Sequence, residues 1–266
     1  MSNKEFKIKI SNNLLQKTKY DLNIYTQKLI MLLIYKKKKE LLNNQVYNYD
    51  GTFDENKIYE VLDSVMKNST VLNLEELKSL FGNKKNISFR EIENHFINFS
   101  GSIQWIENNQ IKKIIPIGRL LNVYMETKEI EFFLNYEIKD YILSLKNKWS
   151  EIDISIYLQL SSKYQIRLYE YLCLYDCVKN NKTNFMRKRT LEDIRNFFDI
   201  PDSYQMKNIK QKVFNPAIKA LNKIYAENRQ KINLVCLKLD QNNPKKITHL
   251  RIDILNLIKE EAKNVI

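Results

Sequence analysis

Apolar side chains recur every three or four positions along the stretch that begins near residue 204. This period predicts one long amphipathic helix over residues 204–226. Its apolar side is formed by Ile209, Val213, Ala217, Ala220, Leu221 and Ile224. Pro216 lies inside this helix. Because proline lacks a backbone donor and clashes with the preceding turn, we expect a kink between residues 212 and 216.

A short helix and a turn precede the long helix, and two strands follow it. Thr190, with an aspartate three residues later, predicts a capped helix that ends at Phe198. A proline at position 201 disfavours helix at the residue before it, so residues 199–203 are predicted to be the turn. Alternating apolar positions at 231–239 and 247–254 predict a β-hairpin. Helix, turn, helix and hairpin is the order of a winged helix.

The first half of the chain shows the same order of elements. Asn73 and Ser88 each stand three residues before a glutamate, which predicts two capped helices. The second of these helices carries an apolar stripe formed by Ile92, Phe96 and Phe99. The predicted strands are residues 6–10, 103–107, 113–125 and 129–134. The sequence therefore predicts an α+β, mainly helical fold of two tandem winged-helix domains, with residues 1–147 in the first and 148–266 in the second.

An earlier helix in the first half is apolar nearly all round, which predicts a central place in the core. Its apolar residues are Leu29, Ile30, Leu32, Leu33 and Ile34. The lysine run Lys36–Lys39 follows directly. Because lysines complement the negative end of a helix dipole, we expect this run to end the helix. A surface patch that binds a polyanion is the alternative.

Charge favours an anionic partner. The 44 Lys and Arg residues outnumber the 31 Asp and Glu residues, which gives a net charge of +13. The excess is larger in the second half: residues 1–147 hold 22 basic and 18 acidic residues, and residues 148–266 hold 22 and 13. The chain is also rich in Lys, Asn, Ile and Tyr, a bias that an AT-rich genome produces without selection for binding.

Sequence motifs of enzymes are absent, so we predict a non-enzymatic protein with no catalytic residues, no metal and no cofactor. The four glycines form no nucleotide-binding or hydrolase motif. His95 and His249 stand far apart, and we assign them structural or surface roles. Cys173 and Cys177 could face each other on one helix, but no further ligands are visible nearby. A nucleophilic tyrosine that nicks DNA is the enzymatic alternative.

The location of the protein follows from what the sequence lacks. Three cysteines without framework spacing favour a reducing cytoplasm. The longest apolar run, Leu29–Tyr35, is far shorter than the roughly 20 residues that span a bilayer. The first residues carry no apolar segment of signal-peptide length. We therefore expect a soluble cytoplasmic protein with no membrane contact.

Polar residues on the long helix are the candidate contacts to double-stranded DNA. Amide side chains can bond adenine in the major groove, and lysines can neutralise phosphates. Opposite the apolar side lie Asn208, Gln211, Lys212, Asn215, Lys219 and Asn222, with Lys207 on the flank and Lys210 nearer the apolar side. Two basic groups outside the helix complete the set: Arg187, Lys188 and Arg189 before the capped helix, and Lys245 and Lys246 at the hairpin tip. A solvated amphipathic helix in a Lys- and Asn-rich protein is the alternative.

Three segments of the second half, SKYQIRLYEYL, DIPDSYQ and VFNPAIKALN, resemble the plasmid replication initiators of the Rep_3 family. The segment KISNNLLQKTKYDLNIYTQKLIMLLI resembles the opening of these proteins as well. The resemblance implies two winged-helix domains that bind directly repeated origin DNA, called iterons. By that match Asn208, Lys210, Gln211 and Lys212 lie on the DNA-reading helix of the family.

The resemblance also implies partners and a mode of action. Such initiators bind iterons as monomers, help to melt an AT-rich region, and bring in the host initiator and the replicative helicase. Dimers that pair through the N-terminal domain often repress their own gene, so a homodimer in equilibrium with monomer is expected. A winged-helix transcriptional regulator without initiator activity is the alternative function.

Overall fold

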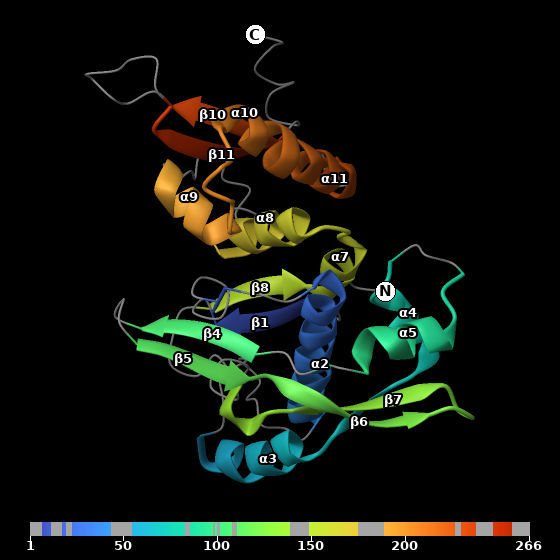
Figure 1. The fold of residues 1–266 in the computed structure, drawn as a ribbon. Coiled ribbons are helices and arrows are strands. Elements are labelled where there is room, and N and C mark those ends of the chain that lie inside the picture. Colours follow the sequence, from blue (N-terminus) through green and yellow to red (C-terminus); the bar gives the residue numbers. More distant parts are fainter. Residues whose placement is uncertain are drawn as a thin grey trace. The chain divides into compact units, whose positions relative to one another are not determined.

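The computed structural model contains two compact units, residues 1–161 and 162–266 (Figure 1). It describes residues 7–11, 18–19, 23–43, 55–82, 86–97, 99, 102–107, 111–138, 149–174, 189–226, 230–237 and 247–256. Each unit has its own buried apolar core. The expected pair of winged helices is present, one in each unit.

The core of the first unit is built on helix α2 (Ile24–Asn43), with α3 (Glu55–Lys67) packed against it. The five apolar residues predicted to make α2 central are all at most 6% exposed. Leu62, Val65 and Met66 of α3 are buried as well. Burial on nearly every side explains why α2 shows no single apolar stripe.

The lysine run does not end α2, which continues four residues beyond Lys39. The prediction was wrong because two of the lysines, Lys36 and Lys37, bond to backbone carbonyls and glutamates of the first unit. The ammonium of Lys37, which is fully buried, donates to the carbonyls of Asn68 (2.9 Å) and Ser69 (3.4 Å) and pairs with Glu40 (3.1 Å). These carbonyls follow the C-terminal end of α3, where helical partners run out.

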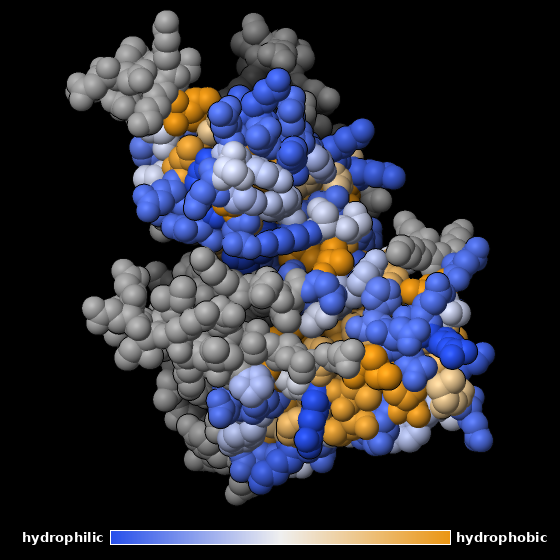
Figure 2. Space-filling view, viewed as in Figure 1, coloured by the Kyte–Doolittle hydropathy of each residue, from blue (hydrophilic) through white to orange (hydrophobic). Residues whose placement is uncertain are grey.

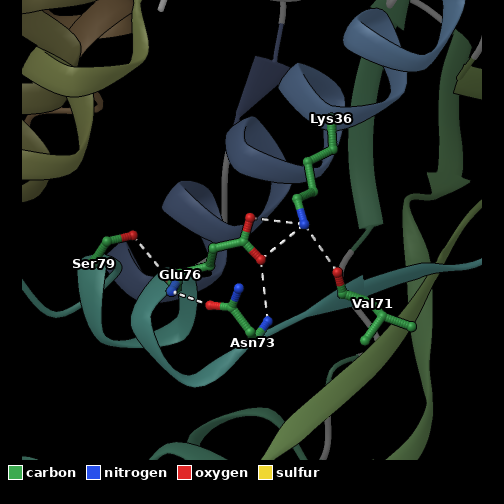
Figure 3. A network of polar contacts seen from close by, with 5 residues as sticks. All are labelled: Lys36, Val71, Asn73, Glu76 and Ser79. Atoms are coloured by element: carbon green, nitrogen blue, oxygen red, sulfur yellow. Dashed lines mark hydrogen bonds and ion pairs between the residues drawn. The ribbon is translucent and has the colours of Figure 1, made fainter.

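Lys36 joins a second network, drawn in Figure 3. Its ammonium lies 2.8 Å from each carboxylate oxygen of Glu76 and 3.0 Å from the carbonyl oxygen of Val71. The same carboxylate accepts from the backbone of Asn73, whose side chain accepts in turn from the backbone of Glu76. Lys36 is therefore a structural contact between α2 and the capped helix rather than part of a free basic patch.

The winged helix of the first unit runs β3 (Thr70–Leu72), α4 (Leu74–Ser79), α5 (Phe89–Phe96), β6 (Gly118–Tyr124) and β7 (Glu129–Leu134). The strands form one antiparallel sheet in the order β3-β7-β6. Both predicted capping boxes, at Asn73 and Ser88, are confirmed. The predicted stripe on α5 is buried, and Phe96 and Phe99 meet Phe132 of β7 edge to face at 5.9 and 5.8 Å.

One predicted strand, residues 113–125, is two strands. β5 (Ile111–Pro116) and β6 are separated by Ile117, which is buried and whose carbonyl accepts from the backbone of Asn135 at 2.7 Å. Proline cannot donate to a ladder, which fits the end of β5 at Pro116. At Gly118 a Cβ would stand 2.1 Å from the carbonyl oxygen of Phe133, so only glycine permits β6 to start this close to β7.

The first unit holds two more antiparallel pairings. β2 (Thr18–Lys19), β4 (Ser102–Glu107) and β5 form a sheet in the order β2-β4-β5. β1 (Lys7–Ser11) pairs with β8 (Trp149–Asp153). The predicted strands at residues 6–10 and 103–107 correspond to β1 and β4, each within one residue at either end.

The boundary between the units falls after residue 161, rather than after residue 147 as the sequence suggested. The polar stretch around residue 148 resembles a linker, but β8 pairs with a strand near the N-terminus. Helix α7 (Ile154–Gln159) follows, capped by the Asp153 side chain, and the ammonium of Lys28 donates to the Leu158 carbonyl at 2.6 Å. These long-range contacts hold residues 149–160 in the first unit.

The second unit runs α8 (Lys163–Leu174), β9 (Arg189–Thr190), α9 (Leu191–Phe198), α10 (Met206–Asn208), the π-helix η2 (Ile209–Phe214), α11 (Asn215–Tyr225), β10 (Gln230–Leu237) and β11 (His249–Asn256). Its sheet has the order β10-β11-β9. The predicted cap at Thr190 is confirmed, since its hydroxyl accepts from the backbone of Asp193 at 3.0 Å. This is the same winged-helix order as in the first unit.

The long helix comprises α10, η2 and α11, and its predicted disruption takes the form of a π-helical turn. The backbone of Asn215 donates to the Lys210 carbonyl, five residues earlier. Pro216 follows directly and has no donor for an α-helical bond, and a wider turn relieves the clash of its ring with the preceding carbonyl. The π-turn thus lets the helix continue through proline to Tyr225.

The π-turn also changes which residues of the long helix are buried. The buried residues are Ile209, Val213, Phe214, Ala217, Leu221 and Tyr225. Ile209 and Phe214 both reach the core because their separation of five residues matches a π-turn. Ala220 and Ile224, which a uniform period places on the apolar side, are only half-buried.

Candidate nucleic-acid interface

The turn before the long helix is fixed by side chains from the helices around it. Asp199 ends α9 in the left-handed conformation (φ 49°) and forms an ion pair with Lys163 of α8. The guanidinium of Arg195 donates to the carbonyls of Pro201, at 2.9 Å, and Tyr204. These contacts define where the long helix begins.

A buried ion pair within α8 orients an arginine that bonds to α9. Arg167 is 4% exposed and lies 2.6 Å from a carboxylate oxygen of Glu170, which is fully buried. Its Nε and Nη2 donate to the Phe197 carbonyl at 3.0 and 2.7 Å, and its guanidinium lies 4.1 Å from the Phe197 ring centroid. Arg167 and Glu170 of the segment SKYQIRLYEYL thus neutralise each other, and Arg167 also bonds to the last turn of α9. These contacts orient α8 and α9 relative to each other.

The exposed side of the long helix carries the predicted polar residues. We define its polar face as Lys207, Asn208, Lys210, Gln211, Lys212, Asn215 and Lys219. Five of these side chains are exposed, and Asn208 and Lys210 are half-buried. Residues 203–226 contain five lysines and no acidic residue. Hydrophilic residues cover much of the described surface of this unit in Figure 2.

Asn222 does not belong to the polar face, contrary to the sequence prediction. Its amide nitrogen donates to the Ile232 carbonyl at 3.2 Å, and its amide oxygen accepts from the Ile232 backbone at 2.6 Å. This reciprocal pair attaches α11 to the start of β10. A face assignment from helical period alone cannot reveal such a contact.

A cation–aromatic contact joins the turn before the long helix to η2, and the sequence did not point to it. The ammonium of Lys212 lies 5.0 Å from the ring centroid of Tyr204. Burial raises the pKa of the nearby Tyr164 phenol, and the charges of Tyr204 and Asp199 raise it further. With sixteen tyrosines in the sequence, nothing marks Tyr204 as the partner of Lys212, because Tyr204 precedes the helix and helical spacing does not apply to it.

Four predicted DNA contacts, Arg187, Lys188, Lys245 and Lys246, lie outside the described residues. Arg189 is in β9 opposite Leu250 of β11, and its side chain is outside the described set. These five positions stay predictions.

The corresponding helix of the first unit, α5, has a different surface. Its exposed side chains include Arg90, Glu91 and Asn94, and α5 carries a net charge of −1 with histidine neutral. The ring of His95 contacts Tyr25 and Phe81, with centroids 4.9 and 5.0 Å apart. An apolar patch in Figure 2 covers part of this unit. Nothing in α5 matches the polar face of the second unit.

The described part of the chain holds no candidate metal site and no candidate membrane span. No group of three or more His, Cys, Asp or Glu residues there could hold a metal ion. Among the same residues, no helix has the length and apolarity that crossing a bilayer requires. Cys173 is buried in α8, and Cys177 is outside the described residues.

Two winged helices, one with an exposed lysine- and amide-rich second helix, define the class of winged-helix DNA-binding proteins. Models of the two domains of one family match the chain: "Initiator Replication protein, WH1" over residues 7–173 and "Initiator Rep protein, WH2" over residues 190–254. The chain belongs to this family of replication initiator proteins, as the sequence resemblance indicated.

A solved structure supports the fold over nearly the whole chain. The chain is similar to the protein in "Crystal structure of Pi initiator protein in complex with iteron DNA", with a TM-score of 0.65 and 14% sequence identity. The match covers 95% of this chain and 98% of the other. No curated protein matches the chain.

Proposed function

We propose that this protein initiates plasmid replication by binding directly repeated origin DNA through the polar face of the second unit. Lysines of that face neutralise phosphates, and Asn208, Gln211 and Asn215 supply amides for base edges in the major groove. Family membership supports the initiator role. The printed description of the similar Pi initiator, bound to iteron DNA, supports repeats as the target.

One observation carries this proposal: the long helix presents five lysines and no acid while its other side is fixed in a core. Phosphate contacts require cations that are free to leave water and approach the backbone. Base contacts require side chains held in register by a rigid element. The polar face meets both requirements, since Val213, Ala217 and Leu221 behind it are at most 1% exposed.

We propose a division of labour between the units. Residues 162–266 have 21 basic and 11 acidic residues, whereas residues 1–161 have 23 and 20, so the second unit is the stronger polyanion binder. The first unit then serves for dimerisation, coupling and auxiliary DNA contacts. Binding of repeats leads to opening of an AT-rich region and to recruitment of the host initiator and helicase in the cytoplasm, and a dimer in equilibrium with the monomer represses the protein's own gene.

Footprinting of purified protein on the DNA that flanks its gene tests the proposal. We expect protection of several direct repeats beside an AT-rich tract, with major-groove contacts at regular spacing. Protection of a single palindrome at a promoter would instead make the protein a transcriptional regulator. Absence of any sequence-specific footprint by folded protein would refute both.

We also propose that the protein acts without cleaving DNA. Incubation with supercoiled origin DNA and divalent metal should leave the plasmid supercoiled. Nicking that one Tyr→Phe change abolishes would contradict this proposal.

A further inference from the structure

We infer that Tyr204 is a positioning residue that holds the ammonium of Lys212 as a phosphate contact at the start of the long helix. The inference rests on the proposed function, because it assumes that the polar face binds DNA. It adds an uncharged residue, Tyr204, to the proposed DNA-binding surface. It also distinguishes Lys212 from the other lysines of the polar face, because the ammonium of Lys212 is held by an aromatic ring.

The geometry begins with the Tyr204 backbone. Arg195 donates to the carbonyls of both Pro201 and Tyr204, so one guanidinium from α9 fixes the residues on which the Tyr204 ring is mounted. The ring is half-buried, which limits its motion, and the ammonium of Lys212 lies 5.0 Å from its centroid. A cation in this position is attracted by the negative face of the ring.

Two acidic residues stand in the turn before Tyr204: Asp202 is exposed, and Asp199 is already neutralised. Asp199 forms an ion pair with Lys163, so its charge does not compete strongly for the Lys212 ammonium. Lys212 itself is exposed, and its ammonium can still donate to a phosphate while its side chain rests on the ring. A lysine held in this way loses less side-chain freedom when DNA binds than a lysine that extends into water.

A comparison within the same helix provides the control. Lys219 is exposed on the polar face but stands 15 residues after Tyr204. At about 1.5 Å per helical residue, it lies roughly 20 Å along the helix from that ring. Lys212→Ala and Lys219→Ala remove the same charge, and only Lys212→Ala removes the partner of Tyr204.

The test measures the affinity of full-length protein for the footprinted repeat over a range of salt concentrations. Ordering a flexible side chain on binding costs about 0.5–1.5 kcal/mol, and a lysine already held by the ring is spared part of that cost, so Tyr204→Leu should weaken binding by about threefold. Tyr204→Phe keeps the ring and should bind like the wild type. Lys212→Ala should weaken binding and reduce the magnitude of the salt slope by about one unit.

Double variants separate positioning from a general effect on the fold. In a Lys212→Ala background, Tyr204→Leu should cause no further loss, whereas in a Lys219→Ala background it should still weaken binding about threefold. In a Lys212→Arg background the loss should also persist, because arginine stacks on aromatic rings. If Tyr204→Leu does not fold, Tyr204→Met, which has no ring, replaces it with the same expectations.

Independent effects of Tyr204→Leu and Lys212→Ala, which multiply in the double variant, would overturn the inference. Equal losses for Tyr204→Phe and Tyr204→Leu would also overturn it, because the hydroxyl rather than the ring would then matter. Failure of the proposed function has a different signature. Lys212→Ala, Lys219→Ala and Gln211→Ala would all leave the affinity of folded protein unchanged.

Discussion

Lysines of the first unit and lysines of the second unit perform different tasks in this molecule. In α2, Lys28, Lys36 and Lys37 donate to backbone carbonyls or pair with glutamate, and Lys28 and Lys37 are buried. On the polar face of the second unit, Lys207, Lys212 and Lys219 are exposed. The difference teaches that a basic run indicates a binding surface only where its charge is available to an outside partner.

The largest expected effect concerns stability of the first unit. Lys37→Ala should lower the free energy of unfolding by about 3 kcal/mol, because it leaves two carbonyls without their donor and creates a cavity. Chemical denaturation measures this change. Lys39→Ala, an exposed change in the same run, should stay within about 0.5 kcal/mol of the wild type. Equal losses of unfolding free energy for Lys37→Ala and Lys39→Ala would contradict the distinction between buried and exposed lysines.

The second effect depends on pH. Burial lowers the pKa of Lys28 to about 8 from 10.5, so between these values the unfolded chain binds more protons than the folded one. The free energy of unfolding therefore rises with pH across this window, and the cost of burying the charge is fully present below pH 8. Relative to Lys28→Met, the free energy of unfolding of the wild type should rise by on the order of 2 kcal/mol between pH 7 and pH 9.5.

Denaturation of both proteins across that range checks the sign as well as the size. A wild type that loses stability relative to Lys28→Met as pH rises would mean that its ammonium is stabilised rather than penalised. Lys67→Met, at an exposed position of α3, supplies the matched control substitution.

A smaller effect should be equal in the two units. Thr190, the last residue of β9, and Asn73, which follows β3, each cap a short helix, and Thr190→Ala and Asn73→Ala should each cost about 1 kcal/mol of stability. Thr190→Ala should also weaken DNA binding if the cap helps to orient α9 and the turn. Asn73→Ala should leave the affinity of folded protein unchanged, and an equal loss for both would argue against the division of labour.

Features of the fold with a local cause could be predicted from the sequence. The caps at Asn73, Ser88 and Thr190 depend on two residues three positions apart, and the apolar period of each helix is visible directly. The order of helices and strands in both winged helices followed from these signals. The polar face was predicted for the same reason, since the side of an amphipathic helix opposite the core is exposed.

Features with a distant cause could not be predicted. Because β1 pairs with β8, the boundary between the units lies later in the chain than the sequence suggested. Lys37 belongs to a run that resembles a helix end, but its ammonium bonds to a carbonyl between α3 and β3. The π-turn changed the period of the long helix around Pro216, which brought Phe214 and Tyr225 into the core. Asn222 was assigned to the polar face because its partner, Ile232, lies in another element.

The central claim is that the polar face of the second unit determines specific DNA binding, and substitution of its two central residues tests it most directly. Affinity for repeat and unrelated DNA should be measured at several salt concentrations for Gln211→Ala, Lys212→Ala and the charge-matched control Lys67→Ala. We predict that Gln211→Ala loses about 1–3 kcal/mol of discrimination, that Lys212→Ala reduces the magnitude of the salt slope by about one unit, and that Lys67→Ala changes neither. Wild-type affinity, discrimination and salt slope in folded Gln211→Ala and Lys212→Ala proteins would contradict the account.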